Sequence, residues 1–209
     1  MITIRDQKTF SDARQLIALI QHGLQSRPCA PTRHVVARLA EQSLNDTDFT
    51  AQAPMTLPVL AHFGACIAQV QQLDSALANQ LNIVQPALKW QQSSGYSDDV
   101  LGAGFSANYG WAQLIGPNGF FAGEDFLLGV LMLGPHRHYL DHNHPAPELY
   151  WPLTSHSHWR CEPASFMEKS AGEIIWHAPF QIHATKTFEQ PMLAVWAWTK
   201  DVATPAKLV

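Results

Sequence analysis

Two short stretches of the sequence carry residues whose types and spacing suit a metal-dependent enzyme. In residues 142–150, HNHPAPELY, His142 and His144 are two apart, Glu148 follows His144 by four, and Tyr150 follows Glu148 by two. Further along the chain, His183 lies in the apolar context PFQIHA. Imidazole nitrogens and a carboxylate oxygen together bind divalent ions such as Zn, Fe, Mn, Co or Ni. The three histidines and Glu148 are therefore candidate ligands of a single ion.

Strands are the elements that can bring these side chains to one cavity. Residues i and i+2 of a strand point to the same face. His142 with His144, and Glu148 with Tyr150, can therefore face one cavity from two strands joined by the Pro-rich turn at 145–147. Three or four protein ligands leave one or two positions open for water or substrate, which is typical of a catalytic metal site.

The neighbours of the ligands determine what chemistry is possible. A ligating imidazole needs an acceptor for its other ring nitrogen, and Asp141 and Glu173 are candidates for that role. A phenol titrates near ~10 in water, but a nearby divalent cation favours the phenolate. Tyr150 can therefore ligate the ion or act as a base beside it. Alternatively, it is an ordinary barrel aromatic with a hydrogen-bonded hydroxyl.

From Trp90 onward the pattern predicts an antiparallel β fold. Gly and Pro punctuate short segments rich in Val, Ile, Trp, Phe and Tyr, as in barrels and sandwiches. Seven or eight strands with short turns suit a double-stranded jelly-roll barrel, with the metal residues inside its mouth. The predicted strands are 110–115, 126–134, 148–153, 165–169, 173–176, 182–187 and 192–199.

The first part of the chain has helical periodicity. Ser11 or Asp12 can cap a first helix that Pro28 ends, and Pro31 in a first turn starts a second. The run 57–81 predicts one or two further helices, whose apolar sides pack against the barrel or a subunit partner.

No flexible joint separates the two parts of the chain. We therefore predict one domain, made of a helical N-terminal extension over residues 1–88 and a β-barrel with the metal site over residues 89–209. The apolar helices also make a homodimer possible.

The composition excludes several classes of partner. A net charge of −4 and the lack of a strongly basic run argue against nucleic acid and acidic membrane surfaces. No apolar run approaches the ~20 residues that span a bilayer, and no signal peptide is visible. Cys29, Cys66 and Cys161 lack CxxC spacing and are predicted to be reduced thiols. The expected location is the cytoplasm, and the expected partner is a small-molecule substrate.

The two stretches resemble the motifs of the cupins, G(X)5HXH(X)3–4E(X)6G and G(X)5PXG(X)2H(X)3N. Residues 142–148 supply the HXH(X)3E core, and residues 172–183 supply an imperfect second motif. The chain departs from the pattern in three places: Gly134 lies too far upstream of His142, Ser155 replaces an expected glycine, and PFQIH is one residue short.

A closer resemblance is to the cupin-type dimethylsulfoniopropionate (DMSP) lyases. Their pattern adds a tyrosine two residues after the metal glutamate and another five residues before the second histidine. Tyr150 and Tyr139 occupy those places, and PxxxHA matches residues 179–184. The resemblance implies a cupin jelly-roll fold and one divalent ion, zinc before Fe, Mn, Co or Ni, on His142, His144, Glu148 and His183.

The same resemblance implies a carbon–sulfur lyase that cleaves DMSP to dimethyl sulfide and acrylate. Tyr150, or Tyr139 as its alternate, would remove the proton next to the substrate carboxylate in a β-elimination that needs no redox change. The sulfonium group needs an aromatic wall, since cation–π contacts hold such groups in a desolvated site. Trp196 and Trp198 share a face of the last predicted strand, and Tyr139 can complete the wall, although core packing is the usual role of tryptophan.

Two other functions fit the same ligand set. One is another metal-dependent cupin enzyme, such as a sugar isomerase or a dioxygenase that acts on a small acid, in which the tyrosines are incidental. The other is a non-catalytic cupin that senses a small ligand. Release of dimethyl sulfide and acrylate separates the lyase from both, and stoichiometric metal separates the enzymes from the sensor.

Overall fold

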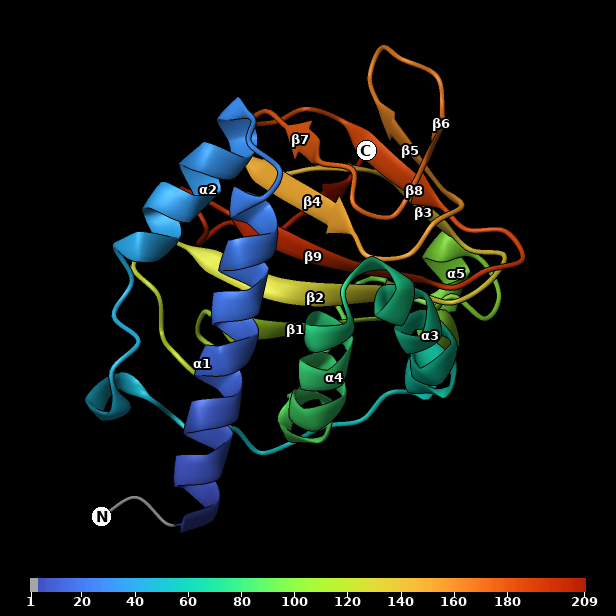
Figure 1. The fold of residues 1–209 in the computed structure, drawn as a ribbon. Helices are drawn as coiled ribbons and strands as arrows, with labels where there is room; N and C mark the ends of the chain where they lie inside the picture. Colours follow the sequence, from blue (N-terminus) through green and yellow to red (C-terminus); the bar gives the residue numbers. More distant parts are fainter. Residues whose placement is uncertain (1–3) are drawn as a thin grey trace.

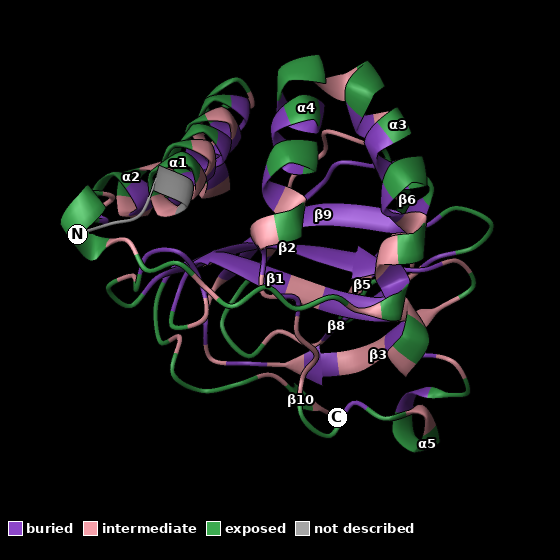
Figure 2. Cartoon of the chain, turned by 90° about the horizontal axis from the view of Figure 1, so that it is seen from below, coloured by how far each residue is buried: buried purple, intermediate pink, exposed green. Residues whose placement is uncertain are grey.

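The computed structural model describes residues 4–209 as three stacked layers, one of helices and two of strands. Figure 2 shows helices α1 to α4 on one face of a sheet that includes β1, β2 and β9, and the strands β3, β8 and β10 on its other side. The helices are α1 (Ile4–Gln25), α2 (Ala30–Ala40), α3 (Phe63–Leu73), α4 (Ser75–Val84) and α5 (Asp98–Leu101). Short 3-10 turns are η1 (Asp46–Asp48), η2 (Pro58–His62), η3 (Gln85–Ala87) and η4 (Ser106–Asn108).

The strands form two five-stranded sheets in which every pairing is antiparallel. The first sheet has the order β1-β2-β9-β4-β7 and the second the order β10-β3-β8-β5-β6. The strands of the first sheet are β1 (Tyr109–Ile115), β2 (Leu127–Leu133), β9 (Met192–Trp198), β4 (Glu148–Pro152) and β7 (Ile175–His177). Those of the second are β10 (Lys207–Leu208), β3 (His138–Asn143), β8 (His183–Lys186), β5 (Ser157–Cys161) and β6 (Met167–Lys169). The predicted jelly-roll barrel with a helical N-terminal extension is confirmed.

Alternation along the strands divides the interior into two cores. Leu149 and Trp151 on β4 point outward into a core that the helices cover, together with Leu16 and Leu77. The residues between them point inward, toward the second sheet. Figure 1 shows α1 and α4 in front of the first sheet, so one continuous core joins the extension to the barrel. The boundary at residue 88 remains a prediction.

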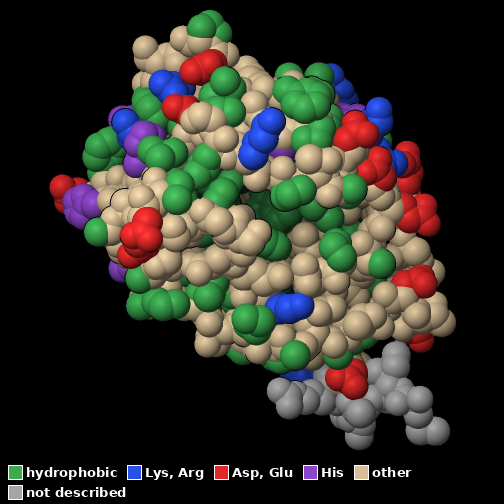
Figure 3. Space-filling view, turned by 180° about the vertical axis from the view of Figure 1, so that it is seen from behind, with side chains coloured by type: hydrophobic (Ala, Val, Ile, Leu, Met, Phe, Trp, Pro, Cys, Tyr) green, Lys and Arg blue, Asp and Glu red, His purple; other side chains and the backbone are tan. Residues whose placement is uncertain are grey.

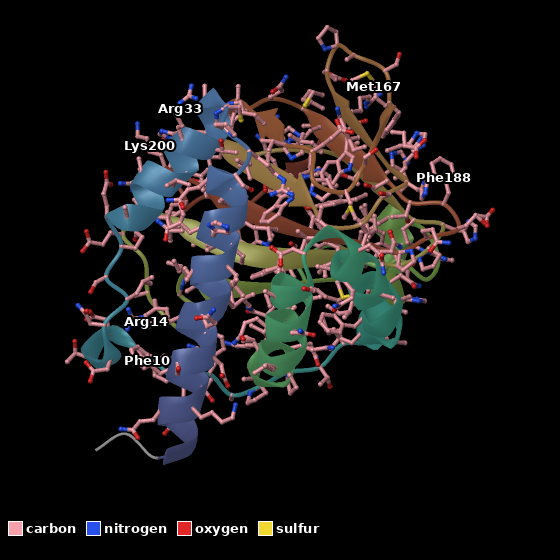
Figure 4. All side chains as sticks on the ribbon, viewed as in Figure 1. Phe10, Arg14, Arg33, Met167, Phe188 and Lys200 are labelled. Carbon is pink, nitrogen blue, oxygen red and sulfur yellow. The ribbon has the colours of Figure 1, made fainter. Side chains whose placement is uncertain are left out.

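The first helix begins earlier than predicted. The cap at Ser11 or Asp12 is wrong, because α1 runs through both residues. Phe10 lies in contact with the Phe49 ring, with centroids 5.5 Å apart, which extends the packed side of the helix toward its start (Figure 4). Asp12 instead pairs with Lys8 one turn earlier, at 2.7 Å.

The other helix predictions hold more closely. Pro31 lies in the first turn of α2, as predicted. The run 57–81 contains α3 and most of α4, which continues to Val84. The two helices break at Asp74, whose carboxylate accepts a hydrogen bond from the Leu77 backbone N–H at 3.0 Å. Glycine is required at Gly23 of α1, because a Cβ there would lie 2.2 Å from the Trp151 ring.

Candidate metal and substrate site

On the inner face of the first sheet, two neighbouring rows of side chains carry the polar and aromatic groups of the site. Glu148 on β4 lies opposite Trp198 on β9 and opposite His177 on β7. In the next inward row, Tyr150 lies opposite Trp196. Directly opposed residues of an antiparallel pair share a face. The predicted face shared by Glu148 and Tyr150, and that shared by the two tryptophans, are therefore present, and His177 is added to the first row.

The second sheet contributes the opposing wall through a β-bulge. The register of β3 against β8 runs from Tyr139 opposite Thr185 to His142 opposite His183, so β3 holds one extra residue. Strict alternation would send Tyr139 and His142 to opposite faces, but a bulge re-aims a side chain. Their rings stack with centroids 4.0 Å apart. The bulge thus turns both side chains to the site.

His144 reaches the site from the link between β3 and β4 and not from a strand. Its Nε2 lies 3.0 Å from Glu148 Oε2, and His183 Nε2 lies 3.3 Å from the same oxygen. The ligand atoms of His144, Glu148 and His183 all lie within 4.8 Å of one another, and all three residues are buried. We call these three residues the ligand triad. His142 flanks it, with its ring centroid 4.1 Å from that of His183.

Backbone carbonyls orient the imidazoles of the site. The Nδ1 atoms of His142, His144 and His183 lie 2.8, 2.9 and 2.8 Å from the carbonyl oxygens of Leu140, Ala146 and Gln181. An N–H on each Nδ1 leaves Nε2 as the free lone pair, which is the tautomer that a metal needs.

The predicted carboxylate acceptors are wrong. Asp141 forms an ion pair with Arg160. Glu173 pairs with Lys169 at 2.9 Å. Asp141 is thus paired with a cation of β5 and Glu173 with a cation of β6, whereas a carbonyl two residues away is already within reach of each imidazole.

The donor set fits a divalent transition metal. Glu148 is ionised: burial alone raises the pKa of its carboxyl, but His144 and the other imidazoles around it hold that pKa well below its usual value. Burial lowers the pKa of His142 well below its usual value, which keeps that imidazole neutral. In addition, His183 Nε2 is buried without a hydrogen-bond partner among residues 4–209. A buried carboxylate that faces several imidazole nitrogens is a usual binding arrangement for Zn and related ions.

A cavity of about 340 Å³ opens beside Glu148. Both predicted tyrosines and both predicted tryptophans line it, along with aromatic and aliphatic residues that the sequence reasoning missed. Seen from behind, the molecule is hollowed near the middle of this face, with hydrophobic side chains in the hollow (Figure 3). The other residues that line the cavity are Ser93, Tyr109, Trp111, Gln113, Pro117, Leu127, Leu131, Val202, Ala203, Pro205 and Ala206.

Aromatic contacts fix the shape of the cavity. The Trp111 ring meets the Trp196 ring edge to face, with centroids 6.3 Å apart. A Cβ at Gly129 would lie 2.8 Å from the Trp196 indole, so glycine on β2 makes room for this ring. The Trp198 indole N–H donates to Glu148 Oε1 at 2.8 Å, and its ring stacks on His144 at 4.2 Å. Trp198 therefore supports the ligand triad as well as lining the cavity.

The two tyrosines predicted for the site are protonated in the protein alone. Burial raises the pKa of Tyr150 well above its usual value, and the charge of Glu148 raises it further. Burial likewise raises the pKa of Tyr139, which lies among the phenols of Tyr109 and Tyr96. Only a nearby positive charge can make either group a base at neutral pH.

His177 is the main site residue that the sequence reasoning missed. It is fully buried, and its ring centroid lies 3.9 Å from that of His183. Burial lowers its pKa to about 4, so it is a neutral imidazole at physiological pH. The available signal was its place directly after the short predicted strand 173–176, with Trp176 pointing to the other face.

Within residues 4–209, no helix has both the length and the apolar character that crossing a bilayer requires.

Comparison with known proteins relates this arrangement to one family. A family model described as DMSP lyase matches residues 31–194. The chain is 29% identical over 109 residues to dimethylsulfoniopropionate lyase DddQ of Ruegeria pomeroyi, and 25% identical over 166 residues to putative dimethylsulfoniopropionate lyase DddL of Cereibacter sphaeroides. These matches cover 52% and 77% of this chain, and 54% and 65% of the length of the two relatives.

Solved structures match the fold over nearly the whole chain. A chain from the crystal structures of the DMSP lyases RdDddP and RnDddQII has a TM-score of 0.78 at 20% identity, covering 96% of this chain and 99% of that one. The crystal structure of DddQ from Ruegeria pomeroyi DSS-3 has a TM-score of 0.71 at 22% identity, with 95% and 96% covered.

Proposed function

The chain belongs to the DMSP lyase family, and we propose that it cleaves DMSP to dimethyl sulfide and acrylate by β-elimination. The observation that carries this proposal is the cavity in which two tyrosines and two tryptophans meet the carboxylate of Glu148. DMSP has an anionic carboxylate at one end and a cationic sulfonium at the other. The site offers a partner for each end: the ligand triad and, beside it, an aromatic wall whose Trp198 also contacts Glu148 and His144.

The carboxylate end would be bound at one divalent transition metal ion, zinc before Fe, Mn, Co or Ni. We assign His142, His144, Glu148 and His183 as its ligands, with the ligand triad as the centre and His142 at its edge. A bound ion would polarise the substrate carboxylate as a Lewis acid and favour the phenolate of a nearby tyrosine.

Tyr150 is the proposed base, with Tyr139 as the alternate. Tyr150 lies two residues along the same strand face from Glu148 and lines the cavity with it. Its phenol oxygen would take the proton from the carbon next to the substrate carboxylate. The electron pair of that C–H bond would form the acrylate double bond, and the C–S bond would break to release neutral dimethyl sulfide. Tyr139 stacks on His142, and its hydroxyl donates to the Tyr96 hydroxyl at 3.4 Å.

The sulfonium end would rest against Trp196 and Trp198, with Tyr139 completing the wall. The rings of the two tryptophans lie edge to face, with centroids 6.1 Å apart, and both line the cavity. Aromatic faces hold a desolvated cation with about 2 kcal/mol or more. The largely apolar lining also disfavours a sugar isomerase, since Gln113 already accepts a hydrogen bond from the Asn118 backbone N–H.

The test is product formation by the purified protein. We expect dimethyl sulfide in the headspace and acrylate in the NMR spectrum in equal amounts when metal-loaded protein is mixed with DMSP. The Glu148→Ala variant should lose both metal and products, whereas His156→Ala, at an exposed histidine, should retain them. Stoichiometric metal without either product would contradict the lyase assignment.

A further inference from the structure

His177 is an imidazole without a hydrogen-bond partner. It is 0% exposed, and within residues 4–209 neither of its ring nitrogens makes a hydrogen bond. Burying a polar group without a partner costs roughly 1–3 kcal/mol, so buried polar atoms nearly always have one. Even the half-buried His62 keeps one nitrogen paired, at 3.2 Å from Asn108 Oδ1.

The position of His177 points its ring at the ligand triad. Its Nδ1 lies 3.5 Å from Glu148 Oε2, the same oxygen that lies 3.0 and 3.3 Å from the Nε2 atoms of His144 and His183. Three imidazole nitrogens therefore surround one carboxylate oxygen. Donor atoms held about 2.0–2.1 Å from a tetrahedral zinc ion lie about 3.3–3.4 Å apart, and the distance from His177 Nδ1 to this oxygen is close to that value. His177 lies outside the group of ligand atoms that are all within 4.8 Å of one another, so we expect its ring to shift toward a bound ion.

A hydrogen bond to Glu148 accounts for less. The 3.5 Å between His177 Nδ1 and Glu148 Oε2 is long for a charge-assisted bond. One cation shared by these rings satisfies the lone pairs that face Glu148.

We propose that His177 supplies a further imidazole ligand, through Nδ1, to the divalent ion at this site. The inference rests on the metal site of the proposed function but not on the identity of the substrate. The site would then have one more imidazole ligand than the residues at 142–148 and 183 supply. His177 also adds a ligand from β7, at the edge of the first sheet, next to the ligand that β4 supplies.

Metal affinity of the His177→Leu variant is the first test. Competition between the protein and a chelator should show Zn²⁺ binding at least about tenfold weaker than in the wild type, and Co²⁺ absorption should change in shape and intensity. The metal-free variant should be no less stable, because leucine removes two unpaired buried atoms. His158→Leu is the matched control, since His158 also lies on a strand but packs its ring on Phe188, 4.7 Å away, and should bind like the wild type.

The second test uses the wild type, so it does not depend on the folding of a variant. Histidine ¹H–¹⁵N correlation spectra recorded with and without Zn²⁺ should show the Nδ1 resonance of His177 moving with those of the ligand triad. An unmoved His177 resonance beside shifted His144 and His183 resonances would overturn the inference, as would unchanged affinity in His177→Leu. In either case, cleavage of DMSP by the loaded wild type would leave the proposed function intact, whereas failure to bind metal at all would remove the basis of both.

Discussion

At the scale of single residues, Glu148 is the centre of the site. One of its oxygens accepts from the Trp198 indole, and the other faces the imidazoles of His144, His183 and His177. A fully buried carboxylate is stable only when it is paired or bound to a cation. Its neighbours therefore fix its charge, its orientation and the direction in which it can bind.

Replacing each cavity tyrosine by phenylalanine should identify the base. Tyr150→Phe should bind metal like the wild type and lose about 10²–10⁴-fold in kcat, since that is the usual contribution of a general base. Tyr139→Phe should lose much less, because the aromatic ring that faces the substrate is kept. Rates of acrylate formation, with metal content measured in the same samples, check this. The reverse order of the two losses would assign the base to Tyr139.

At the scale of elements, close packing between α1 and β4 holds the extension on the barrel. Gly23→Ala would put a methyl group into the Trp151 ring, 2.2 Å from its nearest atom, and should destabilise the protein by about 1–3 kcal/mol as an overpacked core. Gly64→Ala in α3 is the matched control, because a Cβ there meets nothing within 4 Å. It should stabilise by about 0.5 kcal/mol through helix propensity. Denaturant unfolding of the two variants gives the comparison, and equal effects would contradict it.

The loop that precedes β1 depends on one carboxylate. Asp98 accepts from the backbone N–H groups of Ser106 and Gly104, both at 2.7 Å, and these bonds lower its pKa below the usual 3.8. The stability that it contributes is therefore full above the unfolded value and is lost as pH falls through the lower folded value. Hydrogen exchange at the Gly104 and Ser106 amides should quicken, beyond the intrinsic pH effect, between about pH 4 and pH 2. In Asp98→Asn, protection should be weak at both pH values.

The sequence predicted the positions of the strands better than the directions in which their side chains point. Alternation and turn residues located seven strands of the barrel within a few residues. The same rules missed β5, because its inward Trp159 sits between polar His158 and Arg160 and no Gly or Pro marks the start of the strand. They also cannot predict the bulge in β3, since a bulge follows from pairing with β8 and not from the local sequence.

The same limit applies to the site. The pattern HXH(X)3E found His144 and Glu148, because their spacing is local. His177 is brought to Glu148 only by the register of β7 on β4. The acceptors of the imidazole N–H groups are backbone carbonyls, and every residue type has one, so the sequence cannot identify them.

At the scale of the whole molecule, the site joins the two sheets. Glu148 comes from the first sheet, His183 from the second, and His144 from the link between them. A cation bound by all three would hold the layers together only in the folded state, because the unfolded chain does not assemble the site.

Removal of metal should therefore lower global stability. Free ion at about 100 times its dissociation constant stabilises the folded state by about 2.7 kcal/mol, or roughly 5–10 °C in Tm for a chain of this size. The Tm of the wild type measured with Zn²⁺ should exceed the Tm measured with a chelator by about this amount. The Glu148→Gln variant should show a much smaller difference, and an equal shift would mean that the ion binds elsewhere.

The C-terminal segment forms part of the cavity wall: Val202, Ala203, Pro205 and Ala206 line it, and Leu208 pairs with His142 through β10. The final residue thus lies one position past a strand that borders the ligand-bearing β3. A purification handle or fluorescent fusion attached there would lie beside this wall of the cavity. Kinetic comparisons between preparations are sound only when the handle is cleaved or joined to the opposite end of the chain.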